Sequence, residues 1–215
     1  MAGLFLCIGA GPGIGLSTAR RFAAEGFRVV LAARQAERLE ALAEDLGGAP
    51  NSGVETATVD CSDSLQVAEL IDRYRSDLEV IQYNAAIIRT QTLQEQPIRS
   101  IPEDIAVNIA SALVAIRQAA EAMTPRRRGT ILLTGGVLGI TPMSNLLTLS
   151  VGKAGLRSAA QALFPSLSAR DVHIAVLTIA TSIAAGSKDA DAVGEAFWRL
   201  HAQPREQWSW EATYG

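Results

Sequence analysis

Short apolar runs alternate with longer segments of helical periodicity along most of the chain. The runs are rich in aliphatic residues and end at glycine or polar residues, which is typical of strands. They predict strands at residues 4–8, 28–33, 54–59, 78–83, 129–134 and 172–179, and a short edge strand at 211–214. The intervening segments carry apolar residues at helical spacing and predict helices at 16–25, 36–46, 64–74, 102–123, 147–168 and 191–202.

This alternation is typical of βαβ units, in which helices cross between parallel strands. Strands that are buried on both faces have continuous apolar sequences, as these do. Right-handed crossovers then produce a sheet whose ligands bind at the carboxyl ends of the strands. We therefore predict the α/β class, with a single doubly wound, Rossmann-type parallel sheet flanked by helices on both faces. The prediction places residues 1–215 in one domain.

The composition limits which binding partners and which cellular compartment are expected for the protein. The 215 residues are 48% hydrophobic and 19% charged, so a large buried core is expected. A net charge of −3 argues against a nucleic-acid partner, and the basic run Arg126-Arg127-Arg128 is interpreted as a solvated turn. We expect no membrane span, no secretory leader and two free thiols, Cys7 and Cys61, which together predict a cytoplasmic protein.

A glycine-rich turn separates the first predicted strand from the first helix. Gly9, Gly13 and Gly15 have the spacing Gly-x-x-x-Gly-x-Gly. A strand, a glycine turn and a helix direct backbone N–H groups toward a phosphate, and glycine allows the close approach. The turn alone is also compatible with an ordinary tight connection between strand and helix.

Further motifs follow this turn at intervals along the chain. Asp60 ends the third strand, Asn84-Ala85-Ala86 follows the fourth, Asn108 lies in the long helix, and Lys153 lies in the next one. With the glycine turn, they make the chain similar to the short-chain dehydrogenase/reductase family over essentially its whole length. The resemblance implies a bound nicotinamide dinucleotide, a small-molecule substrate and no metal site.

The resemblance also implies roles for individual residues. The glycines would hold the pyrophosphate, Asp60 would accept from the adenine amino group, and Lys153 would bind the nicotinamide ribose. Asn84 would sit at the cofactor and pin the fourth strand. Asp60 could instead belong to a helix N-cap region, and Asn84 could simply satisfy backbone groups. The full set expected at the cofactor is Gly9, Gly11, Gly13, Ile14, Gly15, Arg34, Asp60, Cys61, Asn84, Ala85, Lys153 and Thr181.

The end of the second strand bears on the choice between NAD and NADP. An NAD enzyme usually has a carboxylate there, which binds the ribose 2′-hydroxyl. This chain has Ala33, followed by Arg34 and later Arg38. A guanidinium is suited to a 2′-phosphate, so NADP(H) is favoured, with NAD(H) as the alternative. Arg34 could also be a solvent-exposed loop cation.

The chain departs from the family's catalytic set at two positions. The family's acid–base tyrosine lies four residues before the lysine, where this chain has Leu149, and its serine falls on Gly136. Asn108 and Lys153 remain as catalytic candidates. The resemblance then implies an oxidoreductase acting on a small carbonyl or alcohol with an altered proton donor. The alternative is a catalytically inactive NADP(H)-binding sensor or partner subunit.

Several other side chains could supply the missing proton. A relay of Lys153, Asn108 and a water is the most economical, because both residues belong to the family's proton path. The other candidates are Tyr83, Thr134, Thr141, Ser144, Thr148 and Ser182.

Assembly is a further implication of the resemblance, since family members pair through the helices that carry Asn108 and Lys153. We expect a homodimer or homotetramer. The apolar residues available for this interface and for the core are Ile109, Leu113, Ile116, Ala120, Leu156, Ala160, Leu163 and Phe164.

Overall fold

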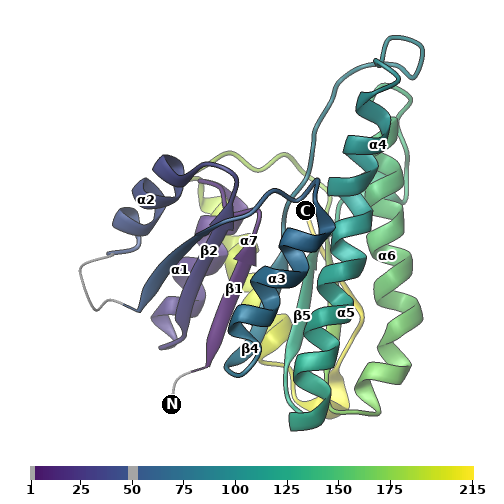
Figure 1. Ribbon diagram of the computed structural model, residues 1–215. Helices are drawn as coiled ribbons and strands as arrows, with labels where there is room; N and C mark the ends of the chain where they lie inside the picture. The colour runs from purple at the N-terminus through teal and green to yellow at the C-terminus, as the bar shows by residue number, and fades with distance from the viewer. Residues whose placement is uncertain (1–2, 48–52) are drawn as a thin grey trace.

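A single seven-stranded parallel sheet organises the protein, whose computed structural model describes residues 3–47 and 53–215 (Figure 1). The strand order is β3-β2-β1-β4-β5-β6-β7, and every pairing is parallel. This confirms the predicted fold class, including the edge strand. The strands are β1 (Leu4–Ile8), β2 (Arg28–Ala33), β3 (Val54–Thr58), β4 (Leu78–Tyr83), β5 (Thr130–Thr134), β6 (His173–Ile179) and β7 (Glu211–Tyr214).

Helices cover both faces of this sheet. One face packs against α3, α5 and α6, and the other against α1, α2 and α7 (Figure 1). The last helix begins three residues before its expected start because the Ser187 hydroxyl accepts from the Ala190 amide and caps it. The helices are α1 (Ile14–Ala24), α2 (Ala36–Asp45), α3 (Ser64–Tyr74), α4 (Ser100–Ile105), α5 (Ser111–Met123), α6 (Leu147–Ser168) and α7 (Lys188–His201).

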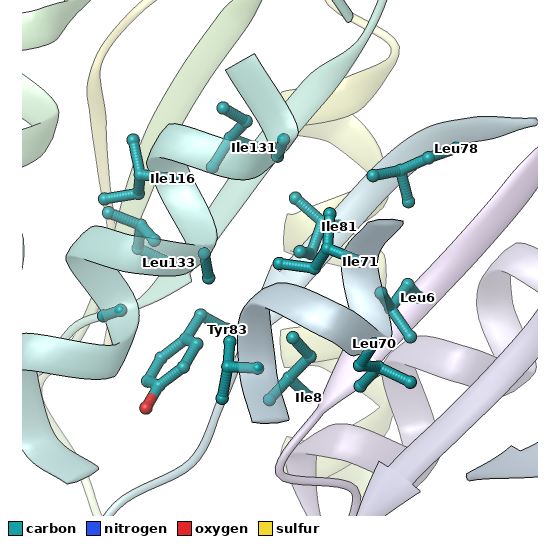
Figure 2. Packing of buried hydrophobic residues seen from close by; sticks show 14 of the residues in the cluster. Leu6, Ile8, Leu70, Ile71, Leu78, Ile81, Tyr83, Ile116, Ile131 and Leu133 are labelled. Carbon is teal, nitrogen blue, oxygen red and sulfur yellow. The ribbon is translucent and has the colours of Figure 1, made fainter. Parts of the chain in front are cut away.

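The core has two halves because side chains alternate across each strand. In β1, Leu6 and Ile8 face α3 and α5 (Figure 2). Phe5 and Cys7 face α1. Both cysteines are free and buried, as expected. The connections run in opposite directions on either side of β1 and β4, which opens a crevice at the carboxyl ends of these strands.

The long helix predicted at residues 102–123 contains a widened turn. A π-helical turn, Ala106–Ala110, joins α4 to α5, and Asn108 lies within it. The Tyr83 hydroxyl donates to the Val107 carbonyl at 2.6 Å and points at this helix in Figure 2. Tyr83 is therefore a core residue that supports the π turn, a feature often found at functional sites.

The same helix bears on the expectation that the chain has no membrane span. Ser100–Arg126 is long and apolar enough to cross a membrane by length and composition, with a mean hydropathy of 1.2 over its best window. The core helix of a globular protein can pass the same test, so the expectation of no membrane span stays a prediction. Of that window, 44% is buried inside the protein, where the helix packs over β4 between α3 and α6.

The basic run after α5 is more than a solvated turn. The Arg126 guanidinium donates to the backbone carbonyls of Ala122, Ser76 and Leu78. Arg127 pairs with Asp171, and Arg128 pairs with Glu79. The run thus ties the end of α5 to neighbouring elements through backbone carbonyls and carboxylates that sequence periodicity does not reveal.

The apolar residues predicted to serve the core and an oligomer interface fall into a buried group and a group at the surface. Ile116, Leu156 and Ala160 are almost fully buried within this chain and belong to the core. Leu113 is 46% exposed on α5, and it borders a groove between α5 and α6 that also contains Leu163. The groove gives these two helices a partly apolar face, with Arg117, Glu121 and Arg170 among its lining residues.

Candidate functional site

A cleft of about 670 Å³ lies at the carboxyl ends of the strands, over the point where the strand order reverses. We call the part formed by residues that follow β1, β2 and β3 the glycine side. We call the part formed by α6 and by residues that follow β4, β5 and β6 the lysine side. Every residue expected at the cofactor lines this cleft: Gly9, Gly11, Gly13, Ile14, Gly15, Arg34, Asp60, Cys61, Asn84, Ala85, Lys153 and Thr181.

The glycine turn has the geometry of a phosphate cradle. Gly9 has a φ of +85°, and a Cβ there would lie 2.3 Å from the backbone nitrogen of Ala85. The turn leads directly into α1, whose N-terminus has no side-chain cap and no acidic residue in its first turn. Its amides and the positive end of the helix dipole therefore suit an anion. The Asn84 amide donates to the Gly9 carbonyl at 2.8 Å and ties the turn to the end of β4.

Asp60 occupies the turn before α3 on the glycine side. Its carboxylate accepts from the backbone amide and the hydroxyl of Ser62, both at 2.9 Å. These bonds, with a smaller contribution from Arg34, hold the pKa of Asp60 below its usual range. The helix cap itself is Asp63, which accepts from the Leu65 amide. Asp60 thus shapes the turn, and its second oxygen has no hydrogen bond within the described part of the chain.

Two other residues complete the glycine side. Arg34 is exposed just beyond β2 and forms no ion pair with any of residues 3–47 and 53–215. Cys61 follows Asp60, and burial raises the pKa of its thiol to about 11. The thiol is therefore protonated near neutral pH and serves as a small apolar wall rather than as a nucleophile.

Lys153 is the one cationic group on the lysine side among the described residues. Its Nζ donates to the Thr134 carbonyl at 2.6 Å, which fixes the ammonium at the end of β5. Burial lowers its pKa to about 8 because the apolar surroundings disfavour the charged form. Gly139 permits this packing, since a Cβ there would lie 2.7 Å from the Lys153 carbonyl carbon.

Asn108 lies behind the cleft wall and does not line the cavity. Its side-chain oxygen accepts from the Ile87 amide at 2.7 Å, and its side-chain nitrogen donates to the Ile87 carbonyl at 3.1 Å. Gly152 lets α6 approach closely, because a Cβ there would lie 2.5 Å from the Asn108 Cβ. The described contacts make Asn108 a positioning residue that holds the segment after β4.

Leu149 and Gly136 both lie near Lys153. Leu149 precedes Lys153 by one turn of α6, lines the cleft and is 6% exposed. A Cβ added at Gly136 would meet the Lys153 Cγ and the Ile179 carbonyl at 3.7 Å, which is ordinary contact. The position has room for a small side chain. Neither residue offers a proton to a molecule in the cleft.

Only some of the other candidate proton donors line the cleft. Thr134 and Ser182 line the cleft, whereas Thr141 and Ser144 are exposed outside its lining. Tyr83 is committed to the π turn described above. The remaining candidate, Thr148, is buried and bonded to a carboxylate away from the cleft.

That carboxylate, Asp104, is a feature the sequence analysis missed. Its side chain is fully buried and accepts from Gln96 and Thr148, both at 2.8 Å. Arg89 donates to both of its oxygens. The cluster ties the segment after β4 to α4 and to the start of α6, and it therefore holds two walls of the lysine side. An acidic residue within an apolar helical segment was the available signal.

Comparison with known proteins agrees with this architecture. The family model for short chain dehydrogenases matches residues 4–191. An uncharacterized oxidoreductase of Staphylococcus saprophyticus is 26% identical over 193 residues, or 88% of this chain and 80% of that protein. A crystal structure of a short-chain dehydrogenase from Rhodopseudomonas palustris matches with a TM-score of 0.87 at 26% identity, covering 99% of this chain and 97% of that one.

A second solved structure shares the fold at lower identity. It is a metagenomic short-chain oxidoreductase in complex with NADP, with a TM-score of 0.86 at 23% identity, covering 99% of this chain and 96% of that one. The parallel sheet, the glycine turn at its switch point and the match over most of the sequence lead to one conclusion. The chain belongs to the short chain dehydrogenase family of oxidoreductases.

Proposed function

We propose that this protein is an NADP(H)-dependent oxidoreductase that interconverts a small carbonyl compound and its alcohol. The observation that carries the proposal is the single cleft that joins the glycine turn, Arg34 and Lys153. The uncapped N-terminus of α1 and the positive φ of Gly9 suit a pyrophosphate. We propose a cytoplasmic location as well, in keeping with two buried free thiols.

The preference for NADP(H) over NAD(H) rests on the end of β2. Ala33 and Arg34 line the cleft there, and no carboxylate stands at the strand end to bind a ribose 2′-hydroxyl. The Arg34 guanidinium could make charge-assisted hydrogen bonds to a 2′-phosphate. The NADP complex of the metagenomic fold neighbour supports this preference.

Lys153 is the proposed proton donor in place of the family's tyrosine. Bound NADPH supplies the hydride that reduces the carbonyl carbon. The Lys153 ammonium is then the group that can give a proton to the carbonyl oxygen, and its lowered pKa, about 8, suits this transfer near neutral pH. Asn108 contributes by holding the Ile87 segment, because its amide is engaged by backbone groups.

A turnover assay with a matched pair of lysine variants tests this assignment. NADPH oxidation is followed over a panel of aldehydes and ketones for the wild type, Lys153→Ala and Lys188→Ala, with NADPH affinity measured separately by fluorescence. We expect Lys153→Ala to lower kcat by about 10²-fold or more. Lys188, which is exposed at the start of α7, is the control. Unchanged kcat in Lys153→Ala would refute the role of Lys153.

The second candidate function is an NADP(H)-binding sensor or partner subunit without catalysis. The observation in its favour is that Leu149 closes the cleft one turn before Lys153 with an apolar side chain. Tight NADPH binding without turnover over the whole panel would establish this alternative. Steady turnover of any member would remove it.

We also propose that two or four copies assemble through α5 and α6. The support is the groove between these helices, which is bordered by Leu113, Ala120 and Leu163. A second copy would remove this apolar surface from water. A monomeric mass by light scattering at micromolar concentration would contradict the proposal.

A further inference from the structure

The lining of the lysine side is apolar apart from Lys153 and uncharged polar groups. The other charged lining residues of the described chain, Arg34 and Asp60, both lie on the glycine side. The polar lining groups on the lysine side are Asn84, Thr134, Thr181 and Ser182, which carry no charge. Its larger apolar lining residues include Ile87, Ile88, Leu138, Leu149, Ile179 and Ile183.

The apolar lining continues outward onto the surface. Ile88 lines the cleft and is 73% exposed, so its side chain lies at the mouth. The segment after Ile88 runs beside the segment that enters α6, through the isolated bridge between Gln91 and Leu146. The loop before that segment carries Val137, Ile140 and Met143, all exposed large hydrophobic residues. Exposed apolar residues that gather beside a cleft provide a surface suited to an apolar ligand.

The cation next to this mouth is already neutralised. Arg89, which follows Ile88, donates to Asp104, and the side chain of Asp104 is completely buried. A substrate carboxylate or phosphate at the mouth would have to compete with that buried ion pair. An anion placed against the apolar lining without a partner would lose part of its hydration.

We infer that the substrate is an uncharged carbonyl compound with an extended hydrocarbon part, which rests on the proposed function. The carbonyl oxygen lies toward Lys153. The hydrocarbon part packs on Leu149 and Leu138 and leaves the cleft over Ile88. Chain length then contributes to affinity through burial of methylene groups, and a charge at the far end of the chain weakens binding.

A homologous series of probes tests this inference by turnover. The straight-chain methyl ketones from butan-2-one to decan-2-one are compared with oxo-carboxylates of equal carbon number, which carry the charge at the far end. We expect kcat/KM for the ketones to rise about threefold per methylene until the mouth is filled. Each carboxylate should be at least about tenfold poorer than its ketone. A flat series, or a preference for the carboxylates, would overturn the inference.

A binding measurement keeps the inference separate from catalysis. Primary alkanamides of increasing chain length mimic the carbonyl without being reduced, and their affinity is measured by calorimetry with and without NADP⁺. Graded amide affinity without any ketone turnover would contradict the proposed function and support the inferred ligand class. Turnover combined with amide affinity that does not depend on chain length would support the proposed function and contradict the inferred ligand class.

A matched pair of surface variants locates the effect. Ile88 and Leu65 are both 73% exposed, but Leu65 lies on α3 outside the cleft lining. We expect Ile88→Glu to remove most of the chain-length dependence of amide affinity and Leu65→Glu to leave it unchanged. Equal loss in both variants, or no loss in Ile88→Glu, would show that the mouth does not contact the ligand.

Discussion

The two sides of the cleft use different parts of the polypeptide. On the glycine side, backbone amides at the start of α1 and the left-handed conformation of Gly9 provide the binding geometry. On the lysine side, any chemistry depends on individual side chains, chiefly Lys153 beside Leu149. Backbone geometry persists as long as the glycines and the strand register do. Side-chain chemistry can be lost or altered by one substitution, so binding and catalysis can diverge within one fold.

The largest expected effect comes from adding hydroxyl groups to the lysine side. The double variant Leu149→Tyr, Gly136→Ser places a phenol one helical turn from Lys153 and a hydroxyl against its stem, where the structure has room at position 136. We expect kcat for ketone reduction to rise by about 10²-fold or more, because a general acid and an oxyanion donor are both supplied. The assay is NADPH oxidation at saturating ketone.

The control for this gain is Leu149→Phe with Gly136→Ser, which adds the ring without its hydroxyl. It should show no comparable rise. An equal rise in both variants would attribute the effect to Gly136→Ser or to packing of the cleft wall. No rise in the tyrosine variant would mean that the lysine side does not present a carbonyl to residue 149.

A smaller effect is expected on the glycine side from Arg34→Gln. This exposed side chain makes no ion pair with the described residues, so its removal should leave stability nearly unchanged. Loss of charge-assisted bonds to a 2′-phosphate should weaken NADPH binding by about 10- to 100-fold and leave NADH binding nearly unaffected. Fluorescence titration with both cofactors measures the ratio. Arg38→Gln serves as the control, because Arg38 lies outside the cleft lining. Parallel weakening of NADPH and NADH would place Arg34 elsewhere than at the 2′-phosphate.

The smallest effect is a pH dependence set by Lys153. Its pKa is lowered to about 8, so the proton donor is present below that pH and is lost as the pH rises through it. We expect kcat for reduction to fall by about tenfold per pH unit above this point. The Lys153→Arg variant, whose side chain stays protonated, should lack the inflection. If the inflection persisted in Lys153→Arg, the group that titrates would be a different residue.

Much of the fold follows from short-range patterns. The apolar runs predicted the five inner strands β2, β1, β4, β5 and β6, because buried parallel strands lack polar alternation. The edge strands β3 and β7 were also predicted, although they contain polar residues and are only partly buried. The helix cap at Asp63 follows from a local side-chain to backbone bond. The grouping of Asp60, Asn84 and Lys153 in one cleft follows from the rule that carboxyl ends of parallel strands share an edge.

Other features depend on partners far away in the sequence. The π turn around Asn108 is supported by the Tyr83 hydroxyl from a different element. The Asp104 cluster needs Arg89, Gln96 and Thr148 to converge from three segments. No periodicity within a single helix reveals either arrangement, because the partners are brought together only when the helices pack on the sheet.

The sequence alone predicted the sheet, the glycine turn and the set of residues that line the cleft. These depend on backbone conformation and on apolar spacing, which are local properties. The placement of Asn108 behind the wall, the lowered pKa of Lys153 and the apolar mouth at Ile88 emerged only from the packed molecule. Each depends on burial and on distances between separate elements, and these exist only after the chain has folded.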